Sequence, residues 1–134
     1  MNNYGITHKI TREGMLDLFY TCLCGGSIGF GSIDLDMDRE LYLEARKSLK
    51  SKGPEDYICV EDIYREVLSK GHQIIWRDVE DDETFDHEFG LSDLIDNFEN
   101  VEPHLINDIL CEEDDQVTHD SILQCLLLGE IVYG

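Results

Sequence analysis

Lysine and arginine are missing from the last part of this chain. No basic residue follows Arg77, whereas residues 78–134 contain 18 aspartates and glutamates. The charges of residues 1–53 balance at seven basic and seven acidic, so the whole formal charge of −20 comes from residues 54–134. This distribution predicts a surface that binds a positively charged partner, and it argues against direct binding of the chain to nucleic acid.

Long apolar runs are missing as well. No segment approaches the roughly 18 apolar residues that a membrane-spanning helix requires. Residues 1–10 also lack the apolar stretch behind a basic start that is typical of a secretory signal. We therefore expect no membrane contact and a cytosolic location. Hydrophobic residues still make up 42% of the 134 residues, which is enough for one compact domain covering residues 1–134, with a strongly acidic part at 54–134.

Metal-binding and disulfide patterns are absent too. The five cysteines are odd in number and irregularly placed, which favours reduced side chains over a disulfide framework. Cys22 and Cys24 are the only close pair, and a tetrahedral zinc site would need two further ligands, so we expect both to pack in the core. The histidines show no spacing of four residues on a helix. The sequence predicts no metal and no cofactor.

Catalytic and phosphate-binding motifs are lacking. The glycines of residues 26–31 follow a predicted helix, precede a strand and have no lysine beside them, so they indicate a connecting turn and not a phosphate loop. His119, Asp120 and Ser121 are triad residue types, but consecutive helical residues point about 100° apart and cannot form a relay. We expect Asp120 and Ser121 to serve the first turn of the last helix, and we expect no enzyme activity.

Alternating aspartates occur at Asp34, Asp36 and Asp38. They resemble the start of a calcium loop, which requires a glycine at its sixth position and a glutamate at its twelfth. Arg39 and Ala45 occupy those two positions. The apolar residues between the aspartates therefore favour a strand with one acidic face.

The hydrophobic periodicity predicts an α+β fold, with a small antiparallel sheet packed against five to six short helices. A strand is expected at about 32–37, and a hairpin with an acidic tip at about 73–89. Helices are expected within about 11–25, 38–52 and 54–70, and three short ones after residue 90. The helix at 38–52 presents the main basic patch of the chain, which consists of Arg39, Arg46, Lys47, Lys50 and Lys52.

Several residues are expected to begin or end these elements. We predict that Asp38, Ser92 and Thr118 cap helices, and that Pro103 occupies a first turn. Gly71 and Gly129 are expected to end helices. In the second arm of the hairpin, the period of two places Phe85, His87 and Phe89 on the inner face, with His87 as a core residue and not a pH-sensitive group. In the helix at 54–70, the apolar stripe includes Val60.

The acidic residues exceed what solubility requires. A net charge of about 2 to 8 usually keeps a small domain soluble. A compact body of this length is about 36 Å across, and B-DNA carries about 21 charges over that distance, which is close to the charge of this chain. The residues expected to form the partner-binding surface are Asp34, Asp36, Asp38, Glu80, Asp81, Asp82, Glu83, Asp86, Glu88, Asp93, Asp96, Glu99, Glu112, Glu113, Asp114 and Asp115.

In its small size and strong acidity the chain resembles the DNA-mimic inhibitors that phages and mobile elements direct against restriction or CRISPR systems. The resemblance rests on composition alone, so no residue role is transferred by it. It implies a non-catalytic protein that occupies the groove of a basic, nucleic-acid-binding protein or nuclease. The alternative is an acidic accessory module, as a homodimer or with another partner, that binds through apolar residues such as Tyr57, Trp76 and those at 131–133.

Overall fold

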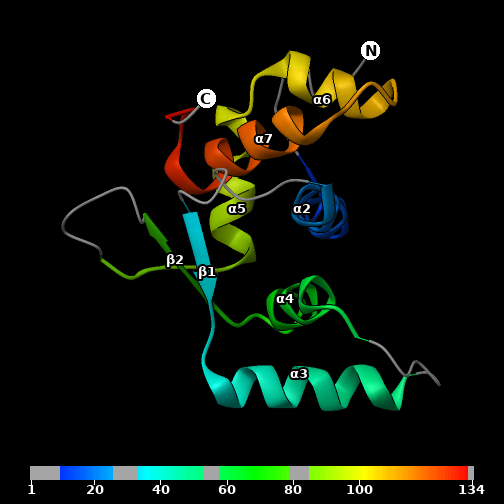
Figure 1. The fold of residues 1–134 in the computed structure, drawn as a ribbon, viewed down its shortest axis with the longest axis vertical. Helices are drawn as coiled ribbons and strands as arrows, with labels where there is room; N and C mark the ends of the chain where they lie inside the picture. The colour runs from blue at the N-terminus through cyan, green and yellow to red at the C-terminus, as the bar shows by residue number, and fades with distance from the viewer. Residues whose placement is uncertain (1–9, 26–32, 53–57, 79–84, 133–134) are drawn as a thin grey trace.

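The computed structural model of the protein describes residues 10–25, 33–52, 58–78 and 85–132. In these residues six α-helices and a three-stranded antiparallel sheet confirm the α+β fold (Figure 1). The elements are α2 (Arg12–Gly25), β1 (Ile33–Asp36), α3 (Arg39–Ser51), α4 (Val60–Ser69), β2 (Ile74–Asp78), β3 (His87–Phe89), α5 (Leu91–Asn97), the 3-10 turn η2 (Phe98–Asn100), α6 (Pro103–Leu110) and α7 (Gln116–Leu128). No helix in these ranges is long and apolar enough to cross a membrane.

Helix α2 lies at the centre of the core, between α7 on one side and α4 on the other (Figure 1). Its apolar positions recur at helical spacing, and Phe19 is only 1% exposed. The ring of Phe19 meets that of Phe89 edge to face, with 5.9 Å between the centroids. This contact joins α2 to the inner face of the sheet, where Ile33 and Ile74 are also buried.

Helix α3 lies at one end of the molecule and packs mainly on α4 (Figure 1). As predicted, the Asp38 side chain caps it, by accepting the N–H of Glu40. At the other end of α3, the buried carboxylate of Glu66 on α4 accepts hydrogen bonds from Ser48 at 3.0 Å and from Lys52 at 3.0 Å. Glu66 thus fixes the position of α3 on the rest of the fold.

Glu66→Gln should lower the free energy of unfolding, and the loss should be larger at neutral pH than at acidic pH. Burial raises the pKa of Glu66, but hydrogen bonds from Lys52, Ser48 and Ser69 outweigh it, so the pKa lies below its ordinary value. A lowered folded-state pKa contributes stability that is fully present above the unfolded value of about 4.3 and is lost as the pH falls from there through the lowered folded-state pKa. We expect a loss of about 1–2 kcal/mol at pH 7 and a smaller loss at about pH 3.

Urea unfolding of both proteins at the two pH values measures this difference. Glu99→Gln on η2 removes an exposed charge and should change stability little at either pH. An equal loss for Glu66→Gln at both pH values would show that the Glu66 carboxylate is not held in its charged form.

Two helix caps differ from the predictions. Gly90, not Ser92, precedes α5, and the Asp93 side chain accepts the N–H of Gly90 at 2.7 Å. For α7, Asp115 is the cap in place of Thr118, since its side chain accepts the Thr118 N–H at 2.9 Å. The carboxylate of Asp115 reaches two donors of Thr118, which lets the helix begin earlier than predicted.

Other predicted helix ends are confirmed. Pro103 occupies the first turn of α6. Gly71 and Gly129 follow α4 and α7 with φ of 85° and 86°, a left-handed conformation that favours glycine. The helix predicted within 54–70 is α4, which begins at Val60. Val60 is 47% exposed, so it does not belong to the buried stripe as predicted. The predicted start of this helix at residues 54–57 lies outside the described residues.

The second arm of the hairpin is less buried than predicted. Phe89 is buried, but His87 is exposed and Phe85 is 61% exposed, so the prediction that all three face the core is wrong for two of them. Strand β3 has only three residues, and the row of side chains that begins at Phe89 runs past the edge of the core. There the imidazole of His87 stacks on Trp76, with ring centroids 4.1 Å apart.

Candidate acidic binding face

Strand pairing brings four predicted acidic residues onto one side of the sheet. In the register, Asp34 lies opposite Arg77, Asp36 opposite Ile75, and Ile75 opposite Glu88. Asp86 immediately precedes β3, and its carboxylate meets the same Arg77. Because side chains alternate across a strand, these carboxylates point away from the buried side. We call Asp34, Asp36, Asp86 and Glu88, all of them exposed, the acidic sheet face.

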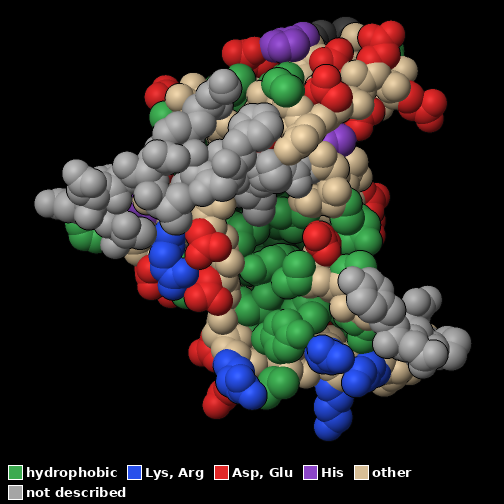
Figure 2. All heavy atoms as spheres, in the orientation of Figure 1, with side chains coloured by type: hydrophobic (Ala, Val, Ile, Leu, Met, Phe, Trp, Pro, Cys, Tyr) green, Lys and Arg blue, Asp and Glu red, His purple; other side chains and the backbone are tan. Residues whose placement is uncertain are grey.

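The guanidinium of Arg77 lies at the centre of this face. The Arg77 guanidinium is 3.5 Å from Asp34, 3.3 Å from Asp36 and 2.5 Å from Asp86. The hydrogen bond to Asp86 is the main effect that raises the pKa of Arg77, so the guanidinium stays charged. Four carboxylates and one guanidinium leave a charge of −3 on these side chains. Figure 2 shows acidic side chains gathered around a basic one beside the strands.

The spacing of the carboxylates follows from strand geometry. Asp34 and Asp36 lie two residues apart on one strand, which corresponds to about 6.8 Å. The carboxylates of β1 are separated from those of the β3 arm by two strand spacings, about 9.6 Å. Rows of phosphates border DNA grooves of about 6 Å and 12 Å, so the face presents negative oxygens at a comparable separation.

Tyr64 on α4 holds β1 in place behind the face. Its hydroxyl donates to the carbonyl of Leu35 at 3.0 Å. Burial, together with the nearby charges of Asp36 and Asp34, raises the pKa of Tyr64 to about 12, so the hydroxyl remains a donor at neutral pH. On the side of Glu88 the face borders a polar hollow of about 510 Å³, lined among others by Asp38 and His72.

The remaining predicted acidic residues do not join this face. Asp38, Asp93 and Asp115 make capping hydrogen bonds at the starts of helices. Asp114 pairs with His119. The others are exposed on different elements, namely Asp96 on α5, Glu99 on η2, and Glu112 and Glu113 in the turn between α6 and α7. The predicted hairpin tip, Glu80, Asp81, Asp82 and Glu83, lies outside the described residues.

A buried polar cluster at the contact of α2 and α7 was not predicted. Helix α7 begins at Gln116, so Asp120 lies beyond its first turn and the expectation that it serves that turn is wrong. Asp120 is instead buried, with an exposed fraction of only 1%. The neighbouring His119 is also buried, with its Nε2 2.6 Å from Asp114. Helix α7 is buried on nearly all sides, and its apolar residues around the whole circumference were the signal that any polar residue within it would be buried.

This cluster does not provide a nucleophile. Cys22 on α2 is fully buried, and burial together with the charges of Asp114 and Asp120 raises the pKa of its thiol. The thiol therefore stays protonated and out of reach of a substrate. Cys24 is exposed, which corrects the prediction that it packs in the core. In the described ranges, no group of three or more His, Cys, Asp or Glu side chains is arranged to hold a metal ion.

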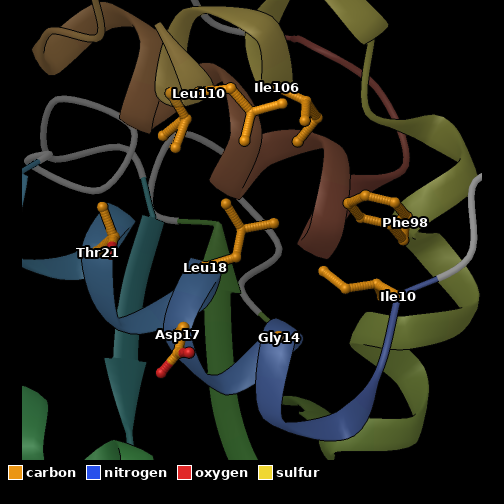
Figure 3. Close-up of a pocket in the computed structure, with 9 residues that line it drawn as sticks. Ile10, Gly14, Asp17, Leu18, Thr21, Phe98, Ile106 and Leu110 are labelled. Atoms are coloured by element: carbon orange, nitrogen blue, oxygen red, sulfur yellow. The ribbon is translucent and has the colours of Figure 1, made fainter. Parts of the chain in front are cut away.

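An apolar pocket lies between α2 and α6. It has a volume of about 230 Å³, and Figure 3 shows Leu18 of α2 below Ile106 and Leu110 of α6. Asp17, a charged side chain on its lining, is paired with Arg65 at 2.6 Å. The described lining of this pocket offers mainly apolar contacts to a ligand.

No protein-family model, curated protein or solved structure matches the chain. The glycine-rich segment at 26–31, where a connecting turn was predicted, lies outside the described residues. Among the described residues, the acidic sheet face brings the most charged side chains together on one exposed surface of the sheet.

Proposed function

We propose that the acidic sheet face binds the basic groove of a nucleic-acid-binding protein or nuclease and excludes its DNA or RNA. In this proposal the protein is a non-catalytic inhibitor of the anti-restriction or anti-CRISPR type. The observation that carries it is the pairing of β1, β2 and β3, which places four carboxylates around one arginine on a single exposed face.

The rigidity of the face supports this proposal. Asp34, Asp36 and Glu88 stand on hydrogen-bonded strands, and Asp86 immediately precedes one. The contacts of Arg77 restrict the carboxylates of Asp34, Asp36 and Asp86. Charges that are already in position lose little side-chain entropy on binding. The net charge of −20 also attracts a basic partner over a distance.

The test is a comparison of two variants with equal net charge. D34N/D36N/D86N/E88Q neutralises the acidic sheet face, whereas D96N/E99Q/E112Q/E113Q neutralises exposed acids elsewhere. Basic proteins captured from nuclease-treated host extract are purified, and their affinity for each variant is measured with and without a competing DNA or RNA duplex. We expect the face variant to bind roughly 100-fold more weakly and with a smaller dependence on salt.

The control variant should keep its affinity within about threefold, since its neutralised groups lie outside the proposed contact. Equal losses in the two variants would mean that only overall charge matters. Binding that a duplex does not compete away would contradict mimicry of nucleic acid. Thermal unfolding of both variants establishes that they are folded.

A further inference from the structure

A cluster of basic side chains and one of the clusters of acidic side chains lie at opposite ends of the molecule. Figure 2 shows basic side chains clustered at the end that α3 forms in Figure 1, and acidic side chains at the end where α6 turns into α7. On α3 the positions 39, 43, 46, 47 and 50 fall within about 100° of the helix circumference. We call these residues, Arg39, Leu43, Arg46, Lys47 and Lys50, the basic stripe.

The basic stripe faces away from the fold. Ala45 is the one buried residue of α3, and the helix packs on α4 through its other side. Leu43 is 49% exposed in the middle of the stripe. The Lys and Arg side chains that form salt bridges among the described residues are others, namely Lys52, Arg65 and Arg77.

The opposite end carries the complementary pattern. Leu110 at the end of α6 is 53% exposed, and Val117 in the first turn of α7 is 60% exposed. Between them in the chain lie the exposed Glu112 and Glu113. The turn is held by backbone hydrogen bonds, including that from the Glu113 N–H to the Asp108 carbonyl at 2.8 Å. We call Leu110, Glu112, Glu113 and Val117 the acidic corner.

We propose that the basic stripe of one molecule docks on the acidic corner of a second copy. On each surface, exposed aliphatic side chains are flanked by charged ones. The charges are positive on the basic stripe and negative on the acidic corner. The two surfaces lie at opposite ends, so the contact is head to tail and leaves one free surface on each molecule, from which a chain grows. The acidic sheet face takes no part in this contact, which therefore does not depend on the proposed function.

The net negative charge of each molecule opposes this contact. The ionic strength decides whether the attraction between the contact charges exceeds the repulsion between the whole molecules. At about 0.15 M salt the Debye length is about 8 Å, so charges in direct contact attract while most of the acidic surface, spread over about 36 Å, is screened. At about 0.01 M salt the Debye length reaches about 30 Å, and the two negative molecules repel as a whole. At about 1 M salt the contact itself is screened. Association is thus strongest at intermediate salt.

The test uses two variants, each of which weakens one of the two proposed contact surfaces. K47Q/K50Q weakens the basic stripe, and E112Q/E113Q weakens the acidic corner, whereas the other surface of each variant stays intact. Analytical ultracentrifugation at about 0.5 mM protein and 0.15 M salt should show wild-type species growing beyond a dimer. Each variant alone should associate roughly tenfold more weakly than the wild type. Their equimolar mixture should stop at a 1:1 dimer, with twice the 15.4 kDa mass of the chain.

Other results would overturn the proposal. A wild-type protein that stays monomeric at every salt concentration has no such contact, and its basic stripe then serves another acidic molecule. Association of either variant alone that matches the wild type would place the contact elsewhere. A wild-type association that strengthens steadily as salt is removed would contradict the balance between contact and whole-molecule charge.

Discussion

Gly25→Ala is expected to destabilise the protein by about 3 kcal/mol. A Cβ atom built on Gly25 would lie 2.2 Å from Nδ1 and 2.3 Å from Cε1 of the His119 ring. Real carbon atoms do not approach that closely, and the ring has little room to move because Asp114 holds its Nε2 at 2.6 Å. The positive φ angles of described glycines occur at Gly71 and Gly129, so the cost at Gly25 comes from the clash alone.

A double-mutant cycle with His119→Ala isolates this clash. His119→Ala removes the ring, so Gly25→Ala should cost far less in its presence, and the coupling between the two changes should be about 2 kcal/mol. Urea unfolding of the wild type, both single variants and the double variant measures the four free energies. Additive losses would contradict the packing of His119 on the end of α2.

Much of the fold follows from local sequence patterns. The helical spacing of apolar residues predicts α2, α3, α6 and α7, because each helix buries one continuous stripe or lies inside the core. Gly71 and Gly129 were predictable because few other residues adopt a positive φ. The caps of α5 and α7 were not, since more than one residue capable of capping lies near the start of each helix, and only the side-chain geometry separates Asp115 from Thr118.

The candidate site was predictable only in parts. The alternation within β1 predicts that Asp34 and Asp36 share one face, and the second arm predicts the same of Asp86 and Glu88. The register that puts both pairs on the same side is set between strands far apart in the chain, and a shift by one residue would have separated them. The position of Arg77 among these carboxylates depends on the same register.

Long-range packing also explains the errors at His87 and Asp120. The period of two is correct for the β3 arm, but how far the core extends beneath it depends on the helices that cover the sheet. Asp120 was expected in the first turn because Thr118 was predicted to be the cap; with Asp115 as the cap, Asp120 lies deeper in α7, where the neighbouring elements enclose it. Neither error concerns the type of secondary structure.

Phe19→Ala is expected to lower stability by about 4 kcal/mol, since a buried Phe→Ala change costs about 3–5 kcal/mol. Phe19 is 1% exposed, and its edge-to-face contact with Phe89 joins α2 to the sheet that carries the acidic face. For a domain of this length the loss corresponds to a fall in melting temperature of about 14 °C. Calorimetry or thermal unfolding followed by circular dichroism measures it.

Phe85→Ala is the matched control, because it removes the same atoms from a side chain that is 61% exposed. Its expected effect is within about 0.5 kcal/mol, the usual range for surface positions. The pair also tests the arrangement of the β3 arm. If Phe85 faced the core together with Phe89, as strict alternation predicts, its loss would cost about as much as that of Phe19. A buried Phe85 would then fix the position of its neighbour Asp86. A small effect at Phe85 instead means that Asp86 keeps its position through Arg77 and the β2 register.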